Sequence, residues 1–145
     1  MSKTKTHKAS CHCGAVQVTI AHLPDYMQNC NCSLCRKSGS VWGYFGAADV
    51  EVLGETKSYQ RRDCSEPAIQ LHFCKTCGST THWCLIEDFK QRTKAEDRIG
   101  VNMRLFEELE LVGTELRFPD GKNWAGDGAF TYRRDAIILS KGDDV

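Results

Sequence analysis

Cys30-Asn31-Cys32-Ser33-Leu34-Cys35 is a run of six residues that carries three thiols. A disulfide between the first two of these cysteines would require poor Cα and side-chain geometry, whereas a tetrahedral ion accepts thiolates from neighbouring residues readily. Cysteines grouped at this spacing are typical of zinc sites. We therefore predict that the segment binds zinc rather than forming a disulfide.

Two further cysteine pairs flank this run at a distance. They are Cys11-x-Cys13 and Cys74-x-x-Cys77. Each pair is followed by a glycine, which tolerates the left-handed backbone of a tight turn. Because each pair lies at the end of a predicted strand, the two can complete one site. Four thiolates close the coordination sphere of zinc, which predicts a structural role for this ion.

The middle group offers three thiolates and no obvious fourth ligand. Three protein ligands with an open fourth position are typical of catalytic zinc, and an all-sulfur set suits an incoming thiol. A free thiol has a pKa of about 8.5, and binding to zinc deprotonates it to give a nucleophile. The alternative is a second structural zinc whose fourth ligand is a histidine, for which His72 and His82 are the candidates.

Several residues near these groups have two interpretations. Arg36 and Lys37 follow the third ligand directly, so they can hold the carboxylates of an anionic thiol such as glutathione, or they can form a solvated surface pair. The aromatic residues Trp42, Tyr44 and Phe45 can line a pocket wall or belong to the core. The remaining cysteines have no partner by spacing. Cys64 is interpreted as an incidental loop cysteine, and Cys84 as a buried small hydrophobe.

Bulk composition excludes two classes of partner. The chain of 145 residues has 19 basic and 19 acidic side chains, and its basic doublets are scattered, so we expect no nucleic-acid partner. No segment approaches the roughly 18 apolar residues of a membrane span. We expect a cytosolic protein, because reducing conditions keep thiols available as ligands.

We predict a flexible segment over residues 1–10, a single zinc domain over 11–140 and an acidic tail over 141–145.

Short runs of alternating, β-branched or aromatic residues are separated by glycines, prolines and charged turns, which predicts a mainly β domain. These runs are residues 15–21, 41–46, 50–53, 56–60, 68–73, 79–85 and 131–140. Residues 86–97 are charged and lack a clear period, so we expect a surface loop there. Residues 103–111 favour one short helix.

The order of the motifs resembles a known family. The chain reads Cys-x-Cys-Gly, then Cys-x-Cys-x-x-Cys-Arg-Lys-Ser-Gly, then Phe-Cys-x-x-Cys-Gly-Ser. This order resembles the glutathione-dependent formaldehyde-activating enzyme family, which includes the centromere protein V type, over residues 11 to about 121. The resemblance implies a mainly β fold of small antiparallel sheets tied by zinc, called a β-tent, with at most one or two short helices.

The resemblance also implies ligand sets and an activity. Two zinc ions per chain are implied. The structural one would be held by Cys11, Cys13, Cys74 and Cys77, and the catalytic one by Cys30, Cys32 and Cys35. The implied reaction adds glutathione to formaldehyde to give S-(hydroxymethyl)glutathione, and it is classed as a carbon-sulfur lyase reaction. The partners would be a small thiol and a small electrophile. The alternative is a zinc-stabilised binding module without turnover, in which a protein side chain fills the open position.

Overall fold

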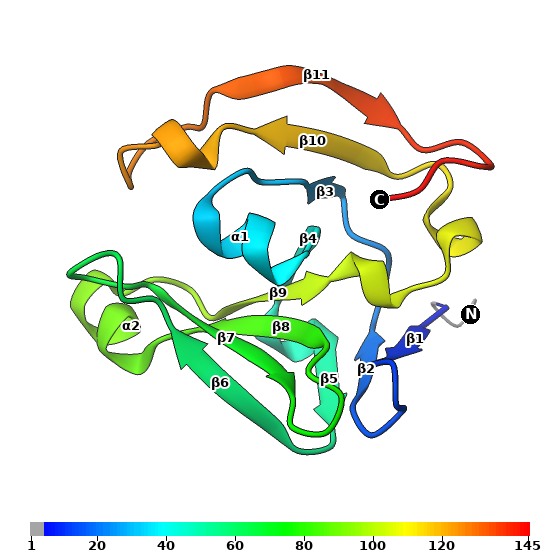
Figure 1. Cartoon of the computed structure of the whole chain (residues 1–145), viewed down its shortest axis with the longest axis horizontal. Helices are drawn as coiled ribbons and strands as arrows, with labels where there is room; N and C mark the ends of the chain where they lie inside the picture. The colour runs from blue at the N-terminus through cyan, green and yellow to red at the C-terminus, as the bar shows by residue number, and fades with distance from the viewer. Residues whose placement is uncertain (1–4) are drawn as a thin grey trace.

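The structure is a computed structural model that describes residues 5–145. These residues form eleven strands in two sheets, together with two short α-helices (Figure 1). The smaller sheet is antiparallel and has the order β1-β2-β5. Its strands are β1 (His7–Ser10), β2 (Gln17–Ile20) and β5 (Val50–Leu53).

The larger sheet has eight strands in the order β11-β10-β3-β4-β9-β8-β7-β6. All neighbours in it are antiparallel except β3 and β10, which are parallel. The strands are β3 (Tyr26–Gln28), β4 (Trp42–Gly46), β6 (Thr56–Gln60), β7 (Ile69–Cys74), β8 (Thr80–Leu85), β9 (Arg98–Asn102), β10 (Glu115–Pro119) and β11 (Tyr132–Ile138). Figure 1 shows the β10–β11 pair on one side of the molecule and the β6–β7–β8 strands on the other.

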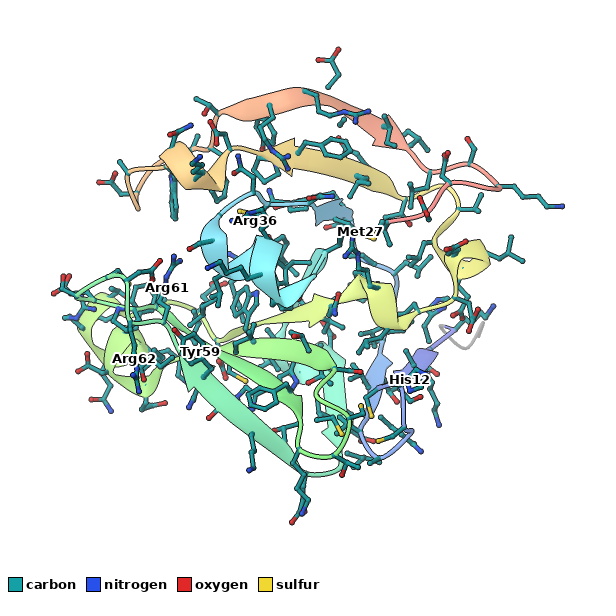
Figure 2. The ribbon with its side chains drawn as sticks, viewed as in Figure 1. His12, Met27, Arg36, Tyr59, Arg61 and Arg62 are labelled. Carbon is teal, nitrogen blue, oxygen red and sulfur yellow. The ribbon has the colours of Figure 1, made fainter. Side chains whose placement is uncertain are left out.

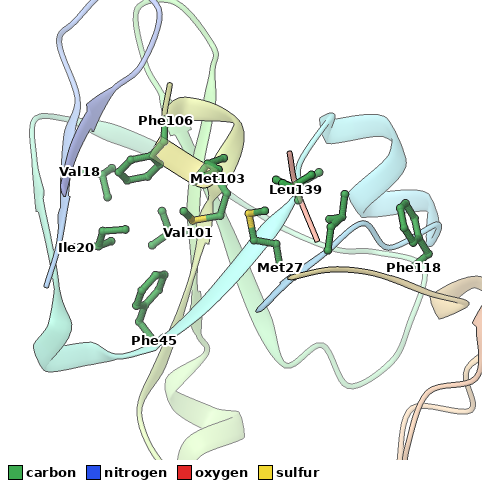
Figure 3. Close-up of a cluster of buried hydrophobic side chains, with 12 residues drawn as sticks. Val18, Ile20, Met27, Phe45, Val101, Met103, Phe106, Phe118 and Leu139 are labelled. Carbon is green, nitrogen blue, oxygen red and sulfur yellow. The ribbon is translucent and has the colours of Figure 1, made fainter. Parts of the chain in front are cut away.

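The main core lies where the smaller sheet packs on one face of the larger one (Figure 3). Strand β2 contributes Val18 and Ile20, which are buried because side chains alternate along a strand and these two point inward. Phe45 of β4 and Val101 of β9 meet them from the larger sheet. Burial of these side chains contributes about 1.5–3 kcal/mol each before the entropy of folding is subtracted.

The opposite face of the larger sheet carries a second cluster beneath helix α1 (Ser33–Ser38). Trp42, Leu71 and Trp83 are buried there, and Leu34 of the helix packs against them. Gly100 of β9 has a steric role, because a Cβ at this position would overlap the indole of Trp83. The glycine therefore lets that indole lie flat across the neighbouring strand.

Two local predictions are wrong. Residues 86–97 contain helix α2 (Glu87–Thr93) instead of a loop. Acidic residues in its first turn and basic ones in its last complement the helix dipole, and Lys90 pairs with Glu87 at 3.0 Å. Residues 103–111 form two 3-10 helices, Met103–Leu105 and Glu108–Leu111, instead of one helix. The break arises because Phe106 adopts extended backbone and its side chain is buried in the core.

The predicted terminal boundaries also differ from the structure. His7–Ser10 forms strand β1 rather than flexible chain, since it pairs with β2 and Ala9 packs on the main core. Residues 1–4 of the expected flexible segment lie outside the described residues. At the other end, Val145 packs against the core, and the Ser140 amide donates to the Asp143 carboxylate at 2.7 Å. The ordered domain therefore extends beyond residues 11–140 on both sides.

The predicted fold class is confirmed. Each of the seven predicted runs overlaps a strand, and the bounds of β5 and β6 agree with the prediction. The parallel pairing of β3 with β10 was not predicted. Within residues 5–145, no helix has both the length and the apolar character needed to cross a membrane.

Candidate functional site

The first cysteine group brings together two chain segments that are 61 residues apart. Its members are Cys11, Cys13, Cys74 and Cys77, whose sulfur atoms all lie within 4.8 Å of one another. The sulfur of Cys13 lies 3.6 Å from that of Cys11 and 3.7 Å from that of Cys74. Bonds of about 2.3 Å to a tetrahedral zinc place sulfur atoms about 3.8 Å apart. The four sulfurs therefore fit one metal ion.

Two tight turns position these sulfurs. Gly14 and Gly78 have φ angles of 83° and 78°, a left-handed conformation that favours glycine. Each turn closes with a hydrogen bond from the glycine amide, to the carbonyl of Cys11 in one case and of Cys74 in the other. The first turn leads into β2 of the smaller sheet, and the second joins β7 to β8 of the larger one. An ion held here would therefore fasten the two sheets together.

Amide and hydroxyl donors make this group suitable for thiolates. The Ser79 hydroxyl, followed by backbone amides, lowers the pKa of Cys77 to about 5. The amides of Cys77 and Thr76 donate to the sulfur of Cys74 and lower its pKa. Hydrogen bonds of this kind stabilise the charged form of a thiol, which is the form that binds metal.

The second group consists of Cys30, Cys32 and Cys35, whose sulfur atoms also lie within 4.8 Å of one another. Cys32 is the N-cap of α1, so its sulfur accepts a hydrogen bond from the Cys35 amide at 3.4 Å. The sulfur of Cys30 accepts one from the Cys32 amide at 3.4 Å. From β4, the indole Nε1 of Trp42 donates to the sulfur of Cys35 at 3.3 Å. Hydrogen bonds from the cysteine loop, from the start of α1 and from β4 therefore hold all three sulfurs in place.

The charge at this group is concentrated on Cys32. The pKa of its thiol lies well below the ordinary range, because the thiols of Cys30 and Cys35 hydrogen-bond to it and the nearby guanidinium of Arg61 attracts negative charge. The pKa of Cys35 is raised by its hydrogen bonds to the same neighbours and by burial. Three thiols this close together favour a cation that can replace their protons.

The two candidate histidines do not belong to the second group. His72 and His82 are paired across β7 and β8, on the face opposite Trp83, because neighbouring residues of a strand point to opposite faces. Their rings are stacked, with centroids 4.5 Å apart and planes 8° from parallel. Together with Cys84 they form a separate group, in which one possible ligand atom from each residue lies within 4.8 Å of the others. Over residues 5–145, no histidine, carboxylate or fourth cysteine joins the three-sulfur set, so the histidine alternative is wrong.

A cavity of about 490 Å³ opens beside the three sulfurs. Its lining includes seven aromatic side chains, among them all three tryptophans of the chain. They are Tyr26, Trp42, Tyr44, Trp83, Trp124, Phe130 and Tyr132. The described lining contains two charged residues, both of them arginines, and no carboxylate. A mostly apolar cavity with a few polar groups is typical of small-molecule binding sites.

The two arginines of the cavity come from different elements. Arg61 follows β6 and is held by both carboxylate oxygens of Asp63, at 2.6 and 2.8 Å. Asp63 also accepts a hydrogen bond from the Ser33 hydroxyl at 3.2 Å, which ties this loop to the start of α1. The guanidinium of Arg98 lies 5.6 Å from the ring centroid of Tyr44. It forms no ion pair with any residue of the described chain.

The backbone after β10 closes the other side of the three-sulfur set. Asn31 lies between Cys30 and Cys32, and its amide nitrogen donates to the carboxylate of Asp120 at 2.8 Å. The side-chain oxygen of Asn31 accepts from the Lys122 amide at 3.0 Å. Between these residues, Gly121 approaches the sulfur of Cys30 so closely that a Cβ would overlap it. The turn and the cysteine loop are therefore one packed unit.

The basic pair predicted to contact a substrate lies outside the cavity. Arg36 projects from α1 and lines a smaller recess of about 170 Å³, which also borders Cys30 and Cys35 (Figure 2). Lys37 lines a separate surface recess with Tyr59. Neither is among the residues that line the large cavity.

The other predicted residues divide between cavity and core. Trp42 and Tyr44 line the cavity, whereas Phe45 is part of the main core. Cys64 is exposed, as expected for a loop cysteine, and Cys84 is half-buried. Burial raises the pKa of Tyr44, helped by the nearby thiols, so its phenol is uncharged at neutral pH. Its hydroxyl donates to the Gln28 side chain at 2.7 Å.

Comparison with known proteins points to one family. Residues 6–117 match the family described as glutathione-dependent formaldehyde-activating enzyme. A curated relative from Halomonas elongata, whose name contains the same enzyme description, is 37% identical over 81 residues. That alignment spans 50% of this chain and 52% of the relative, so the match covers about half of the relative's length. A crystal structure of a Rhodobacter sphaeroides protein is 30% identical with a TM-score of 0.52, covering 70% of this chain and 88% of that one.

Proposed function

Because this chain belongs to the glutathione-dependent formaldehyde-activating enzyme family, we propose that it is a zinc-dependent carbon-sulfur lyase that acts on a glutathione adduct. The simplest such adduct is S-(hydroxymethyl)glutathione, formed from glutathione and formaldehyde. The observation that carries the proposal is the three-sulfur set of Cys30, Cys32 and Cys35 beside a cavity without carboxylates. A three-ligand metal site beside a cavity fits an incoming thiol better than a closed structural site does.

The two cysteine groups would hold two zinc ions with different roles. The four-cysteine group would hold a structural ion, since four thiolates leave no position for a substrate. The three-cysteine group would hold the second ion and leave one position for an external ligand. A zinc ion bound there supplies Lewis acidity that keeps an external thiol deprotonated near neutral pH.

The reaction itself requires only the making or breaking of one bond. The glutathione sulfur bonds to the aldehyde carbon, the carbonyl electron pair moves to oxygen, and this oxygen takes up a proton. In the reverse direction the carbon-sulfur bond breaks and the hydroxyl loses its proton. No group is oxidised or reduced.

Side chains of the cavity would orient the two reactants. Arg98 lacks an acidic partner in the described chain, so it is suited to a glutathione carboxylate. The Tyr44 hydroxyl lies on the same lining as the sulfurs, and because its proton is donated to Gln28, its oxygen can accept a hydrogen bond from the hydroxyl of the adduct. The aromatic lining limits the access of water to the reacting carbon.

A reducing compartment suits this chemistry. All nine cysteines are free thiols in the structure. Thiols stay reduced in the cytosol, and seven of the nine are required as ligands under this proposal. We therefore propose a cytoplasmic location.

Exchange spectroscopy at equilibrium tests the activity. Adding the zinc-loaded protein to glutathione and formaldehyde is expected to increase the rate at which free glutathione and its adduct interconvert. Cys32→Ser is expected to return this rate to the level without protein, because the external thiol loses its site. The matched control is Cys64→Ser, which removes an exposed thiol outside the cavity and should keep the wild-type rate.

Equal exchange rates with wild type, with Cys32→Ser and without protein would refute the formaldehyde and glutathione assignment. If the cobalt-substituted protein then also showed no spectral change on addition of thiol, the non-catalytic binding module would be the better description.

Elemental analysis tests the number of ions. We expect two zinc ions per wild-type chain, because seven cysteines divide into a set of four and a set of three. A stoichiometry that stays near one after reconstitution with excess zinc under reducing conditions would contradict the two-site proposal.

A further inference from the structure

The cavity offers more aromatic surface than the glutathione adduct of a one-carbon aldehyde uses. Its volume of about 490 Å³ falls within the range of roughly 300–1,000 Å³ that is usual for ligands of drug size. Three of its rings lie side by side on the large sheet: Trp42 and Trp83 have centroids 6.5 Å apart, and Tyr44 lies 6.1 Å from Trp83. This row forms one aromatic wall of the cavity, in which Tyr44 is half-buried while Trp42 and Trp83 are only 2% and 8% exposed.

A second aromatic wall comes from the segment between β10 and β11. Trp124 and Phe130 lie in contact there, with ring centroids 4.6 Å apart, and both line the cavity. Trp124 is 39% exposed, although tryptophan has the largest side chain of the apolar residues. A tryptophan that remains this accessible inside a cavity has apolar surface left to bury against a ligand.

The charged residues of the lining indicate which other group the ligand carries. Arg61 and Arg98 are its charged members, and Arg98 makes no ion pair among the described residues. A ligand that satisfies this lining carries an anionic group and a planar apolar group. Glutathione supplies carboxylates, but its apolar groups are a few methylenes, so it offers the aromatic walls no planar apolar partner.

We propose that the preferred substrates are glutathione adducts of aldehydes that bear a planar apolar group, with an aryl aldehyde as the simplest class. The planar group lies between the wall of Trp42, Tyr44 and Trp83 and the pair of Trp124 and Phe130. This inference rests on the proposed function, because the adduct sulfur is placed at the same three cysteines.

The reaction of such an adduct is balanced without a further reactant. In the hemithioacetal of benzaldehyde, the carbon-sulfur bond breaks and its electron pair stays on sulfur. The hydroxyl oxygen gives up its proton and forms the aldehyde carbonyl, and glutathione takes up a proton when it leaves. The products are benzaldehyde and glutathione.

Binding of two stable thioethers separates this inference from catalysis. S-benzylglutathione and S-methylglutathione have no hydroxyl group on the transferred carbon, so neither can be cleaved. With the zinc-loaded full chain, calorimetry is expected to show at least tenfold tighter binding of the benzyl compound, since burial of an aromatic ring against two aromatic walls is favourable.

Substitution of the second wall tests where the ring binds. Trp124→Ala is expected to weaken binding of S-benzylglutathione about tenfold and to change that of S-methylglutathione less than twofold. Leu109→Ala serves as the matched control, because Leu109 is 68% exposed and does not line the cavity. Phe130→Ala provides a second variant of the same wall.

The outcomes distinguish this inference from the proposed function. Equal affinities for the two thioethers, or no binding of either, would overturn the inference even if formaldehyde exchange were observed. A benzyl preference that neither Trp124→Ala nor Phe130→Ala reduces would also overturn it. A benzyl preference that depends on Trp124, without formaldehyde exchange, would support the inference and refute formaldehyde as the electrophile.

Discussion

The Cys74→Ser variant is expected to melt at a much lower temperature than the wild type, whereas Cys32→Ser keeps most of the wild-type stability. Cys74 belongs to the group that joins β2 of the smaller sheet to β7 and β8 of the larger one. Structural zinc binding contributes about 10–16 kcal/mol in zinc-finger peptides, so loss of one ligand should cost several kcal/mol. For a domain of this size that corresponds to a decrease of roughly 10 °C or more.

The three-cysteine group spans only six residues, and its loop is held by other contacts. Asn31 binds the turn at Asp120, and Ser33 binds Asp63, so the loop keeps its place when one sulfur is lost. Thermal melts of zinc-loaded wild type and both variants, followed by circular dichroism, measure the difference. If Cys32→Ser lowers the midpoint as much as Cys74→Ser does, the division into a structural and an open site is wrong.

The strands that alternation predicted are the ones with one buried and one exposed face. Strands β2 and β5 are of this kind, and the period of two is visible in each. Four strands escaped prediction, namely β1, β3, β9 and β10, and two of them, β3 and β9, show different reasons. Tyr26–Gln28 has only three residues, and Arg98–Asn102 is flanked by paired strands on both sides, so its ladder depends on distant segments. Local pattern carries no signal for such pairing.

Cysteine spacing predicted which thiols come together, because ligands a few residues apart must share an ion or a turn. The lining of the cavity is assembled from strands and loops far apart in the chain, so Arg61, Arg98 and Trp124 could not be assigned in advance. The basic pair lies outside the large cavity for a helical reason. Successive residues of α1 are rotated by about 100°, so Arg36 and Lys37 turn away from the side on which Cys35 faces the cavity.

The second large effect is expected for Gly121→Ala, which should weaken metal binding at the three-cysteine group at least tenfold and leave the fold intact. A Cβ at this position would overlap the sulfur of Cys30. The sulfur can move away by rotation about its own side chain, which costs the fold little but removes the sulfur from the ligand set. Gly121 is not in the left-handed region, so backbone strain does not contribute.

The matched control is Gly46→Ala, because Gly46 also has an ordinary φ and a Cβ there would lie 3.6 Å from the nearest atom, a carboxylate oxygen of Asp49. Competition with a fluorescent zinc chelator reports the affinity of each ion. Gly121→Ala should release one of two ions at a lower chelator concentration than Gly46→Ala or wild type, and its exchange of glutathione with formaldehyde should fall in parallel. Retention of both ions at wild-type affinity would show that the backbone at residue 121 does not constrain Cys30. In that case the close approach of the turn to the sulfur would have no role in holding the open site.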